Sequence, residues 1–156
     1  ISNQQIEGFG VYMSQEGKFK VLLPLEPKKE VLRVNTKIGE LPMVFVEKTK
    51  DDISYSVAYF DFPSDIIKTD IDPSKLLDSM RDGAIENVGG KLTGELLISL
   101  DGYPGRQVEI RLGDSKMTMR IYLVNQRVYQ LVATAINAED IYFNSVTNFF
   151  DSFVLL

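Results

Sequence analysis

The sequence predicts one soluble α+β domain built on an antiparallel β-sheet. Two helical segments, near 72–88 and 138–150, lie among short segments in which apolar residues occupy every second position. Such alternation is typical of half-buried strands, whereas apolar residues three and four positions apart are typical of a helix. Links of a few residues join the strands of the second half, and such links are too short for a parallel crossover. The sequence therefore predicts an antiparallel meander in that half.

The first half is expected to contain five strands. Alternating apolar side chains place them at 9–13, 19–23, 30–38, 43–48 and 53–59. Pro24 and Pro27 are expected to end the second strand, since proline donates no ladder hydrogen bond. The segment Gly39-Glu40-Leu41-Pro42 is expected to form the turn between the third and fourth strands, because glycine and proline favour turns.

The segment after these strands predicts a helix over 72–88. Asp72 suits the N-cap, because its carboxylate can accept hydrogen bonds from free backbone N–H groups, and Pro73 suits the first helical position. Gly89-Gly90 is expected to stop the helix. An apolar stripe at helical spacing predicts the buried face, which consists of Leu76, Leu77, Met80, Ala84 and Val88.

Four strands are expected after this helix, at 91–100, 106–112, 116–124 and 127–135. The turn between the first two is expected at Asp101-Gly102-Tyr103-Pro104-Gly105, with Pro104 and Gly105 at the centre of a type II turn. In the third strand one face carries Thr118, Arg120 and Tyr122. The arginine predicts that this face is not fully buried.

A second helix is expected from about Ala138 to Phe150, with Asn137 as its N-cap. Its apolar stripe is mostly aromatic and consists of Tyr142, Val146, Phe149, Phe150 and Phe153. The sequence shows no internal repeat and no linker, so residues 1–156 are expected to form a single domain, in which 1–7 is a loose N-terminal segment.

The composition excludes several classes of function. The 156 residues include no Cys and no His, which rules out Ser–His and Cys–His nucleophile pairs, conventional zinc sites and disulfides. A formal net charge of −5 disfavours nucleic acid and anionic membranes as partners. No apolar run approaches the ~20 residues of a transmembrane helix. The first residue is Ile1 rather than Met, which fits equally a trimmed chain and a mature exported protein whose signal was removed.

No motif in the sequence predicts a catalytic, cofactor or metal site. Gly89-Gly90-Lys91 differs from a phosphate-binding loop, because Leu92 replaces the required Ser or Thr and the turn follows a helix instead of opening one. The acidic stretch from Asp61 to Asp72 does not fit an EF-hand; a solvated loop and a weak cation site both stay open. Glu95 and Glu109 lie on neighbouring strands, as the carboxylate pair of a glycosidase could.

The meander offers one candidate contact surface, made of Tyr103, Arg106 and Arg120. Together with Arg111 and Arg127, its two arginines could form an anion-binding stripe, and its tyrosine could lie exposed on a loop. The alternative for the arginines is cross-strand pairing with Glu95 and Glu109. The alternative for the tyrosine is packing over the sheet.

Five segments share a pattern of strand, turn and helix signals: GKFKVLLP at 17–24, LISLDGYPGR at 97–106, MRIYLV at 119–124, RVYQL at 127–131 and FFDSF at 149–153. These segments resemble the opening strand, the later strands and the C-terminal helix end of the PsbP-like domains (the Mog-type/PsbP-like family). The resemblance covers most of the chain from Phe9 to Leu156. It implies an antiparallel sheet with helices packed on both faces, an αβα sandwich.

The resemblance also implies a range of roles. The family includes extrinsic proteins of photosystem II, a Ran-binding nuclear import factor, and bacterial exported proteins and lipoproteins. It therefore implies a non-enzymatic binding or accessory domain of an exported bacterial protein, in the periplasm, in the thylakoid lumen or anchored to a membrane. The partner would be another protein. No functional residue is carried over, and the oligomeric state stays open, as do a small-ligand or lipid carrier with an apolar cavity and a carboxylate-based hydrolase.

Overall fold

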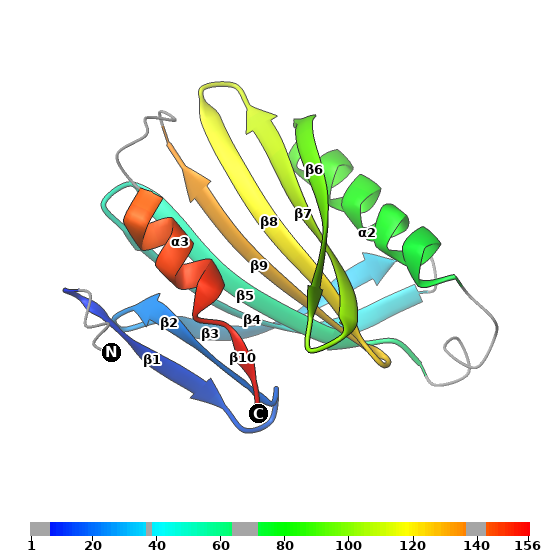
Figure 1. Ribbon diagram of the computed structural model, residues 1–156, viewed down its shortest axis with the longest axis horizontal. Helices are drawn as coiled ribbons and strands as arrows, with labels where there is room; N and C mark the ends of the chain where they lie inside the picture. Colours follow the sequence, from blue (N-terminus) through cyan, green and yellow to red (C-terminus); the bar gives the residue numbers. More distant parts are fainter. Residues whose placement is uncertain (1–6, 37–38, 64–71, 137–142) are drawn as a thin grey trace.

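The computed structural model describes residues 7–36, 39–63, 72–136 and 143–156, which form two β-sheets and two helices (Figure 1). Of the described residues, 62% are in strands and 18% in helices. Along the chain the elements are β1 (Phe9–Ser14), β2 (Phe19–Pro24), β3 (Lys28–Thr36), β4 (Gly39–Lys50), β5 (Ile53–Asp61), α2 (Pro73–Val88), β6 (Lys91–Leu100), β7 (Tyr103–Leu112), β8 (Ser115–Val124), β9 (Arg127–Ala135), α3 (Phe143–Asp151) and β10 (Val154–Leu155).

Seven strands form the larger sheet, in the order β3-β4-β5-β9-β8-β7-β6, and every neighbouring pair is antiparallel. The predicted meander is confirmed, because β6, β7, β8 and β9 are consecutive neighbours and β9 has the predicted bounds. The smaller sheet has the order β1-β2-β10 and is also antiparallel. Its last strand follows α3 directly and was not predicted.

The expectation of an αβα sandwich, with helices packed on both faces of the sheet, is wrong, because the chain is a β-rich sandwich. One face of the larger sheet is covered by α2, which contacts β7 and β8. On the opposite side the smaller sheet forms a second β-layer, beside the short α3 (Figure 1). In this layer β2 packs on the core through Phe19, Val21 and Leu23, which are at most 1% exposed, and β1 pairs with β2.

The core between the two sheets is largely aromatic. Phe19 of β2 lies 5.9 Å from Tyr129 and 5.4 Å from Phe153, measured between ring centroids. Phe149 of α3 is fully buried and packs edge-on against Tyr55 of β5 at 5.3 Å. The predicted aromatic stripe therefore does anchor the last helix. The expected start of that helix, including Asn137 and Tyr142, lies outside the described residues.

The second core lies between the larger sheet and α2. Both predicted ends of this helix are confirmed: Asp72 accepts a hydrogen bond from the Ser74 backbone N–H at 3.0 Å, and Gly89 adopts the left-handed conformation with φ 67°. Leu77 is buried, and Leu76, Met80 and Ala84 pack against the same cluster. Val88, the last residue of the predicted stripe, is instead 40% exposed.

Two predicted turns are strands in the structure. The segment Gly39–Pro42 belongs to β4, and all four of its residues pair with β3. The segment Tyr103-Pro104-Gly105 begins β7, and the turn before it consists of Asp101 and Gly102, with φ of 52° and 84°. Positive φ at both central residues is typical of a type I′ hairpin turn, which an Asp-Gly pair favours.

Candidate functional site

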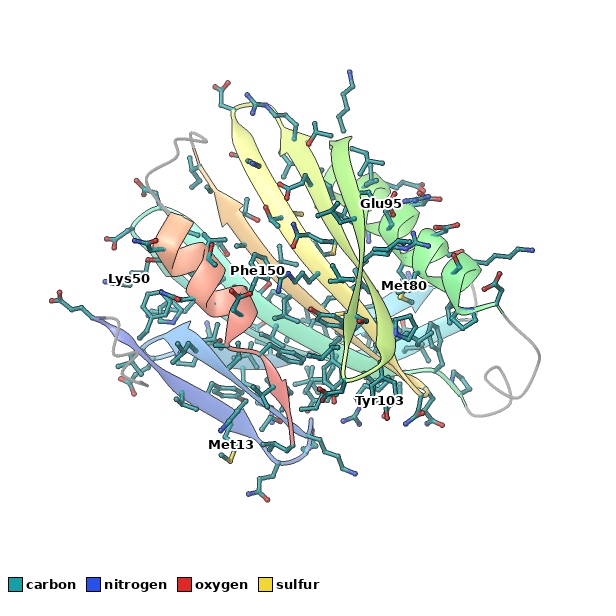
Figure 2. All side chains as sticks on the ribbon, viewed as in Figure 1. Met13, Lys50, Met80, Glu95, Tyr103 and Phe150 are labelled. Atoms are coloured by element: carbon teal, nitrogen blue, oxygen red, sulfur yellow. The ribbon has the colours of Figure 1, made fainter. Side chains whose placement is uncertain are left out.

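The side chains of β6, β7 and β8 alternate between two faces of the larger sheet. One face packs against α2 and is called the α2 face; the other, on the side of α3, is called the α3 face. Val108 and Ile110 of β7 belong to the α2 face, because they join the cluster that holds Leu77. Gln107 and Glu109 therefore belong to the α3 face. Figure 2 shows Glu95 beside α2 and Phe150 on α3, on the two sides of the sheet.

On the α2 face, Arg106 of β7 joins the helix to the sheet. Its guanidinium donates to Asp78 at 2.6 Å, to Glu95 at 2.8 Å and to the Ser74 backbone oxygen at 3.2 Å. Arg81 of α2 donates to the same Glu95 at 2.9 Å. Charge-assisted hydrogen bonds of this kind are the strong ones. Arg106 is only 5% exposed. Its hydrogen bonds to Asp78 of α2 and Glu95 of β6 link the helix to the sheet.

The electrostatics of this cluster favour the charged forms. The hydrogen bond from Arg106 lowers the pKa of Asp78. Burial by itself would lower the pKa of Arg106, but its hydrogen bonds to Asp78 and Glu95 outweigh burial, and the pKa is raised. Arg106 and Asp78 therefore stay ionised at neutral pH. A pair held in this way is structural, because neither group is poised to exchange a proton.

On the α3 face, a groove of about 240 Å³ separates α3 from β7 and β8. Arg120 of β8 lies in it and donates to the Gln107 side-chain oxygen at 2.9 Å. Its guanidinium stands 5.1 Å from the ring centre of Phe150, a cation–π contact, and 3.4 Å from an Asp151 carboxylate oxygen. The groove is lined by Gln107, Glu109, Lys116, Thr118, Arg120, Val146, Thr147 and Phe150.

Glu109 forms the acidic part of the groove. Its carboxylate accepts a hydrogen bond from the Thr118 hydroxyl at 3.1 Å and lies 3.5 Å from the Lys116 ammonium. The opposite wall, from α3, contributes Val146 and Phe150. The groove thus combines cations, a carboxylate and apolar surface, which suits the recognition of a polar segment with an apolar side chain.

Beyond the groove, three cations stand side by side across β6, β7 and β8. The register places Lys91 opposite Arg111, and Arg111 opposite Lys116. Partners that lie directly opposite each other in antiparallel strands point to the same face, here the α3 face. We call these three residues the basic row. Lys91 and Arg111 are exposed.

The structure does not bring the three predicted contact residues together. Arg106 lies on the α2 face, Arg120 lies on the α3 face, and Tyr103 is half-buried at the turn end of β7 (Figure 2). Arg106 pairs with Glu95, as the alternative of cross-strand pairing predicts. Arg120 instead bonds to Gln107 and Asp151. The contact role of the three stays a prediction.

The other candidate residues have separate positions. Glu95 and Glu109 lie on opposite faces of the sheet, so they cannot converge on one substrate as a glycosidase pair does. In the acidic stretch, Asp61 forms a two-oxygen pair with Arg127 at 2.7 and 2.9 Å, and Asp72 caps α2. Residues 64–71 of this stretch lie outside the described residues.

The sequence reasoning named Arg111 and Arg120 but missed the two lysines of the basic row. One lysine could have been found, because a two-residue turn at Gly113-Asp114 puts Lys116 opposite Arg111. The position of Lys91 depends on a β-bulge between Leu92 and Gly94. Without that bulge Leu92 would stand opposite Arg111, and no local signal predicts a bulge at that place.

The fold is PsbP-like. The solution structure of cyanobacterial PsbP (CyanoP) from Synechocystis sp. PCC 6803 superposes with a TM-score of 0.63 at 14% identity, over 100% of this chain and 97% of that one. A protein of unknown function from Pseudomonas aeruginosa superposes with a TM-score of 0.48 at 12% identity, over 89% of this chain and 90% of that one. No protein-family model and no curated protein matches the chain.

Proposed function

We propose that this chain is a non-enzymatic binding or accessory domain that receives a segment of a partner protein in the groove between α3 and the α3 face. The observation that carries the proposal is the lining of this groove. Arg120 and Glu109 offer charges of both signs beside the apolar wall of Val146 and Phe150. A surface of this kind can hold a polypeptide segment by hydrogen bonds and by burial together.

The PsbP-like fold supports the same proposal, because the family that the sequence resembles consists of binding and assembly proteins. We also propose that the domain works outside the cytoplasm, as the exported members of that family do. Neither helix of the described residues is long and apolar enough to cross a bilayer.

A site-specific photo-crosslinker at Thr147 tests the proposal, because this residue is exposed and lines the groove. In cells of the source organism we expect a discrete protein adduct from this position. The control places the same crosslinker at Glu86, an exposed residue of α2 on the other side of the sheet, and should give no such adduct. Adducts of the same pattern from both positions would contradict a specific groove, as would the absence of any adduct from position 147.

A further inference from the structure

We propose that the basic row binds an acidic segment of a partner polypeptide that lies across β6, β7 and β8. This inference rests on the proposed function and names the chemistry of the segment. It starts from the register, which places Lys91, Arg111 and Lys116 in one line on the α3 face.

The cations of the row repel each other in the free protein. Like charges directly opposite in neighbouring strands are destabilising, and Arg111 has a cation on each side. Lys116 forms an ion pair with Glu109 at 3.5 Å. Among the described residues, Arg111 is the one arginine that forms no ion pair; the other five pair with carboxylates. A carboxylate from outside the chain would supply the missing partner.

The row also stands out against the charge of the whole chain. The formal net charge is −5, and on the α2 face the carboxylates of Asp78, Asp82 and Glu95 surround Arg81 and Arg106. The basic row is therefore a local positive field on an acidic protein. Such a field attracts and orients an acidic partner.

The occupant that fits is an extended polypeptide. Neighbouring strands are about 4.8 Å apart, so the three cations span about 10 Å, the length of three or four extended residues. The groove with Phe150 and Val146 adjoins this span through Lys116, which belongs to both. An acidic segment followed by one apolar side chain would occupy the row and the groove together.

A membrane surface or a nucleic acid fits less well. Either would bring an extended negative surface against a chain of net charge −5, and long-range repulsion would oppose the contact. Glu109 also lies next to the row, where a run of phosphates would meet its carboxylate. A short acidic segment reduces the long-range repulsion and avoids the Glu109 carboxylate, because its charged residues end where the basic row ends.

Fluorescence anisotropy with a labelled hexaglutamate peptide at low salt tests the inference. We expect saturable binding that weakens as salt is added and weakens at least about tenfold in the double variant Lys91→Glu/Arg111→Glu. The matched control is Lys28→Glu/Lys29→Glu, which makes the same change in net charge at exposed residues of the opposite edge strand, β3. This control should retain most of the affinity. Both double variants should stay folded, since all four residues are exposed. Lys91→Glu/Arg111→Glu should not melt below the parent, because it replaces the like-charge contact between Arg111 and Lys116 with a favourable one.

Three results would overturn the inference: no binding of hexaglutamate, equal losses in both double variants, or binding of phosphatidylglycerol vesicles in place of the peptide. The crosslink from position 147 separates the two proposals. If hexaglutamate does not bind the parent chain, and the adduct from position 147 still forms in Lys91→Glu/Arg111→Glu, the acidic segment is wrong and the groove stands. If the adduct is also missing in the parent chain, both proposals fail.

Discussion

Replacing Phe19 with alanine is expected to lower the free energy of unfolding by about 3–5 kcal/mol. The side chain is fully buried and lies at the centre of the core between the two sheets. Its ring contacts Tyr59 of β5, Tyr129 of β9 and Phe153, which lies between α3 and β10. Truncation would leave a cavity among rigid rings, which cannot collapse to fill it. Urea unfolding measures the loss.

The matched control for this substitution is Val11→Ala on the neighbouring strand β1, where the side chain is 65% exposed. It should change the free energy of unfolding by less than about 0.5 kcal/mol. If Phe19→Ala were as mild as this control, the smaller sheet would not be a layer of the core. The β-rich sandwich would then be the wrong description.

Replacing Arg106 with alanine is expected to lower the free energy of unfolding by about 2–4 kcal/mol. The substitution removes the bonds that fasten α2 and leaves Glu95 with one cation, Arg81, instead of two. Asp78 is half-exposed, so water offsets part of the loss and holds it below that of a fully buried pair. Urea unfolding gives the size of the effect, and hydrogen exchange in α2 should show that the helix loses protection first.

An exposed ion pair provides the comparison for Arg106. Arg33 and Glu40 join β3 to β4 at 2.7 Å, with side chains that are 61% and 52% exposed. Arg33→Ala should lower the free energy of unfolding by less than about 1 kcal/mol. Similar losses for Arg33→Ala and Arg106→Ala would show that burial adds nothing to the pairing in the α2 cluster.

The features that depend on local chemistry could be predicted from the sequence. Asp72 and Gly89 mark the ends of α2 by their own capping preferences, and short links determine the antiparallel order of β6 to β9. The prediction failed where two local signals competed. At Asp101–Gly105 the Asp-Gly pair forms the turn, and Pro104 lies within β7 one residue before the pairing with β8 begins.

The layers of the fold depend on long-range packing, which the sequence pattern does not show. Alternation in β1 and β2 predicts strands but does not say which sheet they join. The strand β10 has only two residues, Val154 and Leu155, and it exists because they pair with Lys20 and Phe19. The need for glycine at position 105 is likewise visible only in three dimensions, because a Cβ there would lie 2.6 Å from the Tyr122 ring.

The candidate site could be predicted in part. The charge of Arg120 on one face of β8 indicates an incompletely buried surface, and the groove lies there. The register places Arg106 opposite Ile121, the residue next to Arg120. Because successive residues of a strand point to opposite faces, Arg106 and Arg120 lie on opposite faces of the sheet. The basic row needs the register of three strands and one bulge, so it lies beyond the reach of residue pattern alone.

The single substitution Arg111→Glu tests whether the basic row is a binding surface held at a cost in stability, when unfolding and hexaglutamate binding are both measured on the same variant. A glutamate between Lys91 and Lys116 replaces two like-charge contacts with two favourable ones, so the variant should be more stable by about 0.5–1 kcal/mol. The same variant should lose peptide affinity. A variant that binds the peptide as the parent does, or that is less stable than the parent, would show that the row is an ordinary solvated surface.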